Sequence, residues 1–275
     1  MGVNYDVIII GGGSAACSAA LTLINRGKTV AFAANGVETS NLYKAEMVTN
    51  YPGIPSMSGK DMARLFYKQM TDAGAVHISG RALSVMPMGG SFGVAVGNDF
   101  YQSLAVIIAA GITREKLYEG EAEFLGRGVS YCATCDGMLY RGKTVALIGA
   151  GEEADHDEAF LRSIGCNVLR FRENGKYVIS GGMKADTLSI KGQEYKLDGV
   201  FIIKDTVSVS SLVPGIEYKD GGIVTDRTMA TAVPGVFAAG DCTGKPYQLP
   251  KAVGEGNIAA LSACEYIDKM KKGEK

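Results

Sequence analysis

The 275-residue sequence has no apolar run of the roughly 18 residues that a membrane-spanning helix requires, which excludes a helical membrane protein. Residues 1–10 carry no basic start and no cleavage site before a glycine-rich turn, so we expect no secretion and a cytoplasmic location. The net charge is also small, at −1, with 28 Lys and Arg against 29 Asp and Glu. We therefore expect neither nucleic acid nor an anionic membrane among the partners.

Metal ligands are scarce as well. The two histidines, His77 and His156, are isolated, and four of the six cysteines stand singly. These single cysteines are Cys17, Cys166, Cys242 and Cys264. A zinc site needs two pairs of ligands, which this spacing does not supply, so no metal site is predicted. We interpret the four single cysteines as buried packing residues.

The other two cysteines form a Cys-x-x-Cys pair, Cys132 and Cys135, followed by Asp136 and Gly137. Two thiols at this spacing can close a small disulfide. One thiolate can then attack a partner's disulfide while its neighbour resolves the mixed disulfide. In a reducing compartment, six cysteines favour a working dithiol over a structural disulfide framework. The pattern predicts thiol–disulfide exchange, with metal binding or inert thiols as the alternatives.

Glycine, in contrast, is abundant: 37 of 275 residues, about twice the usual 7%. One glycine turn, residues 11–16, follows the apolar run 5–10 and precedes an Ala- and Leu-rich helical stretch to Arg26. The run 29–34 completes a βαβ unit, so this Gly-x-Gly-x-x-Ala pattern predicts a dinucleotide site, the alternative being a merely structural turn. The first helical turn carries no acid, so its N–H groups can hold a pyrophosphate. Residues 33–35, Ala-Ala-Asn, stand where an acid would bind the ribose.

A second turn of the same spacing, residues 149–151, lies between the apolar run 144–148 and a helical stretch that reaches Ile164. Five carboxylates in the first two turns of that stretch repel the phosphates of a second nucleotide. They are Glu152, Glu153, Asp155, Asp157 and Glu158. After the next run, 167–171, Arg172 stands beside a glutamate, so the 2′-phosphate of NADPH finds no basic cluster. We therefore expect no nucleotide at the second turn, where the acids simply stabilise the positive end of the helix.

The last third of the chain returns to the pattern of its beginning. Residues 231–241 combine a turn, a buried strand and a glycine that brings Asp241 close to a ligand, ahead of the helical stretch 254–270. An aspartate at this place suits a ribityl hydroxyl. With domain crossings at residues 111–113 and 207–210, the predicted organisation is a first domain in two parts, 1–113 and 207–275, with an inserted domain at 114–206.

These motifs resemble those of the low-molecular-weight thioredoxin reductase family over nearly the whole chain outside residues 172–205. Residues 123–137 resemble the active-site segment of that family, residues 50–53 its flavin loop, and residues 237–241 its second FAD motif. The resemblance implies an α/β fold with a discontinuous, Rossmann-like FAD-binding domain. A smaller, truncated nucleotide-binding-like insert then carries the Cys-x-x-Cys disulfide. A homodimer is implied as well.

The same resemblance implies roles for individual residues. Cys135 would face the flavin, Cys132 would attack thioredoxin, and Asp136 would be the general acid. The residues implied to bind FAD are Gly11, Gly13, Ser14, Ala15, Ala16, Asn35, Asn41, Asn50, Ala109, Gly111, Gly240, Asp241, Gln248 and Leu249.

The departures from the family lie where NADPH binds. The His-Arg-Arg run of the family corresponds to residues 172–174, Arg-Glu-Asn, and its second βαβ half is largely absent before Leu197. Where the family has a glycine and a Pro-Asn pair, this chain reads Lys-Asp-Thr-Val at residues 204–207. The flavin motifs survive with small changes. This pattern is similar to that of the flavin-containing ferredoxin-linked thioredoxin reductases, which do without pyridine nucleotide.

That similarity implies a path from reduced ferredoxin through FAD to the Cys132–Cys135 dithiol and on to thioredoxin. The path is downhill, because a ferredoxin near about −400 mV and a thioredoxin near about −270 mV differ by roughly 130 mV, or about 6 kcal/mol for two electrons. The chain lacks the cysteines for an iron–sulfur cluster, so the cluster must arrive on the partner. Three alternatives stay open: an NADPH-dependent reductase, a flavin oxidase of small dithiols, and a flavoprotein redox sensor without turnover.

Overall fold

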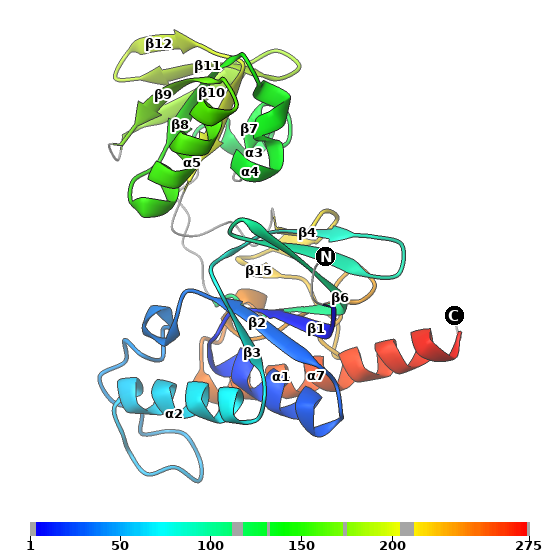
Figure 1. Ribbon diagram of the computed structural model, residues 1–275. Coiled ribbons are helices and arrows are strands. Elements are labelled where there is room, and N and C mark those ends of the chain that lie inside the picture. Colours follow the sequence, from blue (N-terminus) through cyan, green and yellow to red (C-terminus); the bar gives the residue numbers. More distant parts are fainter. Residues whose placement is uncertain (1–3, 112–117, 131–132, 173–174, 204–211, 274–275) are drawn as a thin grey trace. The chain divides into compact units, whose positions relative to one another are not determined.

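The computed structural model describes residues 4–111, 118–130, 133–172, 175–203 and 212–273, without the side chains of residues 134, 135, 152 and 153. The chain divides into two compact units. One comprises Met1–Thr113 and Ser208–Lys275, and we call it the discontinuous unit. The other comprises Arg114–Val207, and we call it the inserted unit (Figure 1).

The discontinuous unit is built on a seven-stranded sheet. Five strands run parallel in the order β3 (Val76–Ser79), β2 (Val30–Ala34), β1 (Asn4–Ile10), β6 (Asp99–Ile108) and β16 (Val236–Ala238). Two antiparallel strands, β5 (Phe92–Val96) and β4 (Ala82–Pro87), continue the sheet from β6. The sheet branches at β6, because β5 pairs with the first half of β6 and β16 pairs with the last residues of β6.

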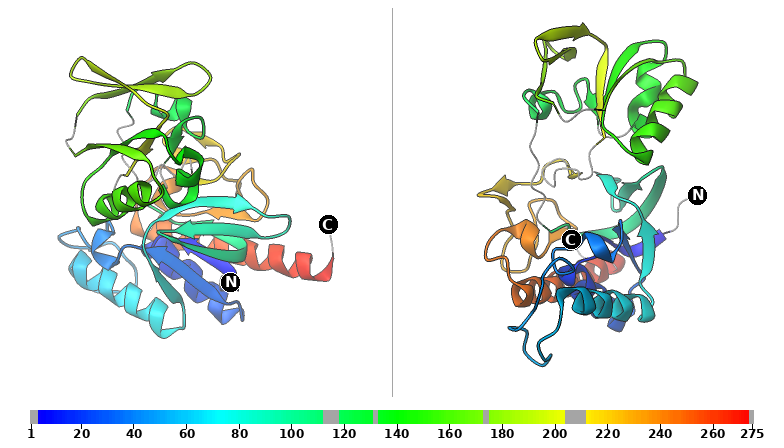
Figure 2. Two further views of the ribbon diagram at one scale, coloured as in Figure 1. Left: turned by 45° about the horizontal axis from the view of Figure 1, so that its top comes forward. Right: turned by 90° about the vertical axis from the view of Figure 1, so that its left-hand side faces the viewer.

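Three helices cover one face of this sheet: α1 (Ser14–Asn25), α2 (Gly59–Asp72) and α7 (Leu249–Lys272) (Figures 1 and 2). Small residues let α1 and α7 pack closely, since a Cβ on Gly256 of α7 would lie 2.2 Å from the carbonyl oxygen of Ala15 on α1. The other face is covered by residues of β4 and β5 and by residues 212–223. That segment includes the hairpin β14 (Tyr218–Lys219) and β15 (Gly222–Ile223). Short 3₁₀ turns, η1 (Val37–Thr39) and η3 (Asp241–Thr243), follow β2 and β16.

The inserted unit has a four-stranded parallel sheet in the order β7 (Val129–Ser130), β13 (Gly199–Ile202), β8 (Thr144–Ile148) and β9 (Asn167–Phe171). An antiparallel sheet of β10 (Tyr177–Gly181), β11 (Ala185–Ile190) and β12 (Gln193–Lys196) packs on one of its faces. Helix α5 (Glu152–Ser163) and the short α4 (Ala133–Asp136) cover the other face. The unit also contains α3 (Glu121–Phe124) and η2 (Gly137–Tyr140).

The predicted α/β fold and both predicted βαβ units are confirmed, as β1-α1-β2 and β8-α5-β9. Helix α7 begins at Leu249, earlier than the predicted start at Gly254, because Pro250 stands in its first turn, where proline is favoured. Throughout the described part of the chain, no helix is both long and apolar enough to cross a bilayer.

Candidate functional site

Most of the predicted FAD residues directly follow four parallel strands of the discontinuous unit, which end together. Ile10 of β1 pairs with Ala33 of β2 and with Ile108 of β6, and Ile108 pairs with Ala238 of β16. Backbone hydrogen bonds continue just past these ends: Ala109 N donates to Ile10 O at 2.8 Å, and Ala239 N donates to Ile108 O at 2.9 Å. This carboxyl edge of a parallel sheet is where α/β folds bind their ligands.

The first glycine turn leaves room above the start of α1. Gly11 has φ +119°, and a Cβ there would lie 2.2 Å from the carbonyl oxygen of Ala109, so the fold itself requires glycine. A Cβ on Gly13, in contrast, would meet no atom within 4 Å. None of the described residues in the first turn of α1 is acidic. The N-cap residue is Gly13, which has no side chain to cap the first N–H groups of the helix. The turn therefore offers an open approach and free N–H groups to a pyrophosphate.

The turn after β16 presents Asp241. Gly240 has φ +87°, and its absent Cβ would lie 3.0 Å from the Cβ of Ala15, so the turn packs against the start of α1. Burial raises the pKa of the Asp241 carboxyl, against the lowering effects of nearby Lys251 and of a hydrogen bond from the side chain of Asn41. The structure thus brings together Asn41 and Asp241, two of the predicted FAD residues.

Two side chains that the sequence analysis missed hold this turn. Lys251 Nζ donates to Gly240 O at 2.9 Å, to Thr243 Oγ1 at 2.8 Å and to Gly244 O at 2.8 Å. Glu255, one helical turn further along α7, accepts from Gly240 N at 2.9 Å and from the Thr243 hydroxyl at 2.9 Å. The two side chains form an ion pair at 3.2 Å and are only 16% and 17% exposed. The sequence did offer a signal for these two residues: a lysine and a glutamate four residues apart, after the predicted glycine turn, can form an ion pair on one face of a helix.

The other predicted FAD residues lie on the same unit. Asn50 Nδ2 donates to Gln248 Oε1 at 3.2 Å, which links the loop at residues 50–53 to the residue before α7. Ala15, Ala16 and Ala109 are buried. Ser14 begins α1, Asn35 is exposed after β2, Gly111 follows β6 with φ +72°, and Leu249 begins α7.

The redox motif belongs to the inserted unit. Cys132 lies outside the described residues, and Cys135 lies within α4 with its side chain not described. Asp136 is described: its Oδ2 accepts a 2.6 Å hydrogen bond from the buried Ser130 hydroxyl of β7. A Cβ on Gly137 would lie 3.0 Å from the side chains of Phe160 and Leu161, so the segment after the motif is held tightly against α5.

The four single cysteines are buried, as predicted. Burial raises the pKa of the Cys17 thiol to about 12 and that of Cys242, beside Asp241, likewise to about 12. It also raises the pKa of Cys166 and Cys264. Since the thiolate is the nucleophile, these thiols are poor reagents for disulfide exchange at neutral pH.

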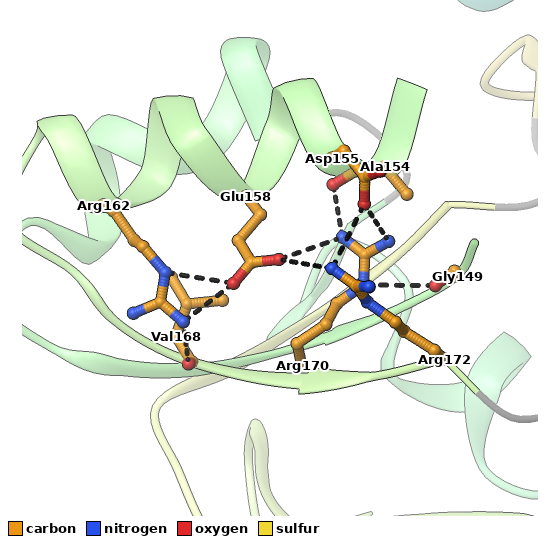
Figure 3. Close-up of polar contacts among 8 residues, drawn as sticks. All are labelled: Gly149, Ala154, Asp155, Glu158, Arg162, Val168, Arg170 and Arg172. Carbon is orange, nitrogen blue, oxygen red and sulfur yellow. Dashed lines mark hydrogen bonds and ion pairs between the residues drawn. The ribbon is translucent and has the colours of Figure 1, made fainter. Parts of the chain in front are cut away.

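A hydrogen bond from Arg170 of β9 to Gly149 O links β9 to the second glycine turn, and ion pairs link β9 to α5 (Figure 3). A Cβ on Gly149 would lie 2.4 Å from the carbonyl oxygen of Ile203, so this glycine serves the fold. Arg170 of β9, whose side chain is 8% exposed, pairs with Asp155 at 3.1 Å and Glu158 at 3.5 Å. Arg172, which the sequence placed against its neighbouring glutamate, also pairs with Asp155, at 3.5 Å.

Known proteins resemble the chain along its whole length. The family model described as pyridine nucleotide-disulphide oxidoreductase matches residues 5–169 and 163–256. Thioredoxin reductase from Bacillus subtilis is 31% identical over 98% of this chain and 96% of its own length. A solved ferredoxin-flavin thioredoxin reductase from Clostridium acetobutylicum has a TM-score of 0.84 and 35% identity, covering 97% of this chain and 99% of that one. A thioredoxin reductase from Gloeobacter violaceus has a TM-score of 0.70 and 28% identity, covering 99% and 95%.

A Rossmann-like sheet with an open glycine turn, joined to an insert that carries a Cys-x-x-Cys sequence, defines a flavin disulfide oxidoreductase. The chain belongs to the pyridine nucleotide-disulphide oxidoreductase family and, within it, to the thioredoxin reductases. FAD is the cofactor of this class, as the sequence predicted. The open space above Gly13 and the half-buried carboxyl of Asp241 fit the pyrophosphate and a sugar hydroxyl of such a group.

Proposed function

We propose that the chain is a cytoplasmic, homodimeric reductase that passes electrons from reduced ferredoxin through FAD to thioredoxin, without NADPH. The observation that carries the proposal lies beside the second glycine turn. There, Arg170 of β9 and Arg172 just after it are already paired with carboxylates of α5. In dinucleotide folds an arginine at this place accommodates the 2′-phosphate of NADPH. The likeness to a ferredoxin-flavin thioredoxin reductase supports the same proposal.

In this proposal the parts 1–113 and 207–275 bind FAD, and the insert 114–206 carries the redox disulfide. When bound, FAD collects single electrons from ferredoxin and releases them in pairs. Gly13 would leave space for the pyrophosphate, and Asp241 would accept a hydrogen bond from a ribityl hydroxyl. The other predicted FAD residues, from Gly11 to Leu249, would hold the remainder of the cofactor.

The dithiol carries the electron pair to thioredoxin. The Cys132–Cys135 disulfide accepts two electrons, which enter at Cys135, and its bond breaks to leave two thiolates. Asp136, held by Ser130, manages the proton at this dithiol. The Cys132 thiolate then attacks the disulfide of oxidised thioredoxin and forms a mixed disulfide. Attack by Cys135 on Cys132 releases reduced thioredoxin and restores the disulfide. Two reduced ferredoxins and two protons are consumed for each thioredoxin disulfide.

Exposed apolar side chains directly after the motif suit a protein partner. Met138 is 57% exposed and Leu139 is 70% exposed on η2. Burying one such side chain against thioredoxin contributes about 1.5 kcal/mol, so Leu139→Ser should raise the KM for thioredoxin about tenfold while flavin reduction by the donor stays unchanged. Met183, 93% exposed between β10 and β11, supplies the control: Met183→Ser should leave KM unchanged. Equal effects of the two changes would contradict docking at η2.

The donor is tested under anaerobic conditions with the FAD-loaded protein. NADPH is added first, reduced ferredoxin second, and the flavin absorbance is followed. We expect no bleaching with NADPH and rapid bleaching with ferredoxin. Rapid bleaching by NADPH alone would refute the nucleotide-independent function, and steady oxygen consumption with a small dithiol would point to an oxidase instead.

The roles of the cysteines are tested by trapping. A thioredoxin that lacks its resolving cysteine, with its remaining thiol activated as a mixed disulfide with thionitrobenzoate, should form a stable mixed disulfide with the reduced Cys135→Ser variant. The Cys132 thiolate attacks the thioredoxin sulfur, and thionitrobenzoate leaves. The Cys132→Ser variant should form none. The opposite result would reverse the two roles, and trapping by neither variant would favour a redox sensor without turnover.

A further inference from the structure

Arg170 takes the place of a ligand at the second glycine turn. Its Nε donates to the carbonyl oxygen of Gly149 at 3.2 Å, and its Nη1 donates to the carbonyl oxygen of Ala154 in the first turn of α5. The remaining contacts go to carboxylates, with Nη2 bonded to Asp155 at 3.1 Å and Nη1 to Glu158 at 3.5 Å. All three nitrogens of the guanidinium are therefore engaged by atoms of the turn and of α5.

Glu158 connects three arginines. Its Oε1 accepts charge-assisted hydrogen bonds from both Nε and Nη2 of Arg162, at 3.0 Å and 2.8 Å. Its Oε2 faces Arg170 at 3.5 Å and Arg172 at 3.9 Å. The Glu158 side chain is 18% exposed and points from α5 toward β9 (Figure 3). The Asp155 side chain is more exposed, at 58%, and pairs with Arg170 and Arg172.

We propose that Asp155 and Glu158 are specificity-determining residues that exclude pyridine nucleotides from the inserted unit. They act in two ways: each neutralises a guanidinium that a phosphate would otherwise bind, and each adds a negative charge beside the glycine turn. Arg170 and Arg172 stand on and just after β9, the strand after whose end a dinucleotide fold binds the ribose and its 2′-phosphate. The basic residues of the site are thus present but are paired internally.

This inference rests on the proposed function, because it explains why NADPH is not the donor. It goes further by predicting that the exclusion can be reversed. Removing the two charges while preserving the shape of the side chains should convert the turn from an arginine-binding site into an anion-binding site.

The test measures binding alone. NADP⁺, which cannot donate a hydride, is titrated calorimetrically into the oxidised, FAD-loaded protein, with NAD⁺ as the comparison that lacks the 2′-phosphate. We expect Asp155→Asn/Glu158→Gln to bind NADP⁺ at least about tenfold more tightly than the unmodified protein, the equivalent of one charge-assisted hydrogen bond, and NAD⁺ to gain less. Adding Arg172→Ala to the double variant should remove most of the gain.

The matched control is Asp186→Asn/Glu194→Gln, which removes the same two charges from β11 and β12 of the same unit. It should bind NADP⁺ no better than the unmodified protein. The inference is overturned if the double variant, with unchanged circular dichroism and FAD content, gains no more than this control. Should the double variant fail to fold, Asp155→Asn alone, at the more exposed acid, decides: about threefold tighter binding is expected, and no gain overturns the inference.

The outcomes separate this inference from the proposed function. Tight NADP⁺ binding by the unmodified protein, followed by flavin bleaching with NADPH, would refute the function itself. A double variant that stays as unresponsive as the unmodified protein would refute only the role of the two acids.

Discussion

Replacing Lys251 by methionine tests how the turn that carries Asp241 is held. Methionine keeps most of the apolar stem of the lysine but removes its ammonium group. The change deletes three hydrogen bonds of 2.8–2.9 Å to the Gly240–Gly244 turn and leaves the Glu255 carboxylate, 17% exposed, without its cation. Breaking a buried pair on one side costs about 3–5 kcal/mol, and the residual exposure of this pair reduces the expected loss to about 2–4 kcal/mol of unfolding free energy.

The assay is urea unfolding of the FAD-free protein, followed by circular dichroism, together with a titration of FAD into the refolded variant. Because the loosened turn presents Asp241 less well, FAD affinity should fall about tenfold or more. Lys269→Met is the matched control: it lies on the same helix and removes an ion pair four residues apart, but that pair is 57% and 68% exposed. Such exposed pairs contribute little. Equal losses from the two changes would refute a supporting role for Lys251.

Three further changes test the rest of the site. Gly13→Ala should fold normally and bind FAD at least about tenfold more weakly. Gly11→Ala should instead lower the unfolding temperature of the FAD-free protein, because its Cβ would lie 2.2 Å from the carbonyl oxygen of Ala109. Equal unfolding temperatures of the two variants would contradict this difference. Burial raises the folded pKa of Asp241 above 3.8, so ionisation of its carboxyl destabilises the FAD-free fold as pH rises through that folded pKa. Relative to the unmodified protein, Asp241→Asn should therefore gain stability between acidic and neutral pH, while its FAD affinity falls. A stability difference that does not change with pH would contradict this prediction. Ser130→Ala should slow thioredoxin reduction about tenfold by freeing Asp136, and this loss should vanish in an Asp136→Asn background; additive losses would show that Ser130 acts elsewhere.

Local patterns were enough to predict both βαβ units. The apolar runs that became β1 and β8 are each followed by a glycine turn and a helical stretch, and these signals lie within a few residues of one another. The Cys-x-x-Cys spacing and the absence of acids from the first turn of α1 could be read in the same way. The predicted start of α7 at Gly254 was wrong, because Pro250 belongs to the first turn of the helix, where proline is favoured.

The sequence by itself therefore determined the α/β class, the first glycine turn, the Cys-x-x-Cys spacing and the five acids at the start of the second helical stretch. Only the tertiary structure showed that Asp155 and Glu158 are the acids that pair with Arg170, because a strand residue and helix residues 12–15 positions away meet only once α5 packs on β9. Only the tertiary structure, too, showed that Lys251 and Glu255 hold the turn of Asp241. Their partner Gly240 lies after β16 and meets the side chains of α7 only once the chain folds back at the sheet edge. Both networks depend on side-chain direction and burial, which residue order does not record.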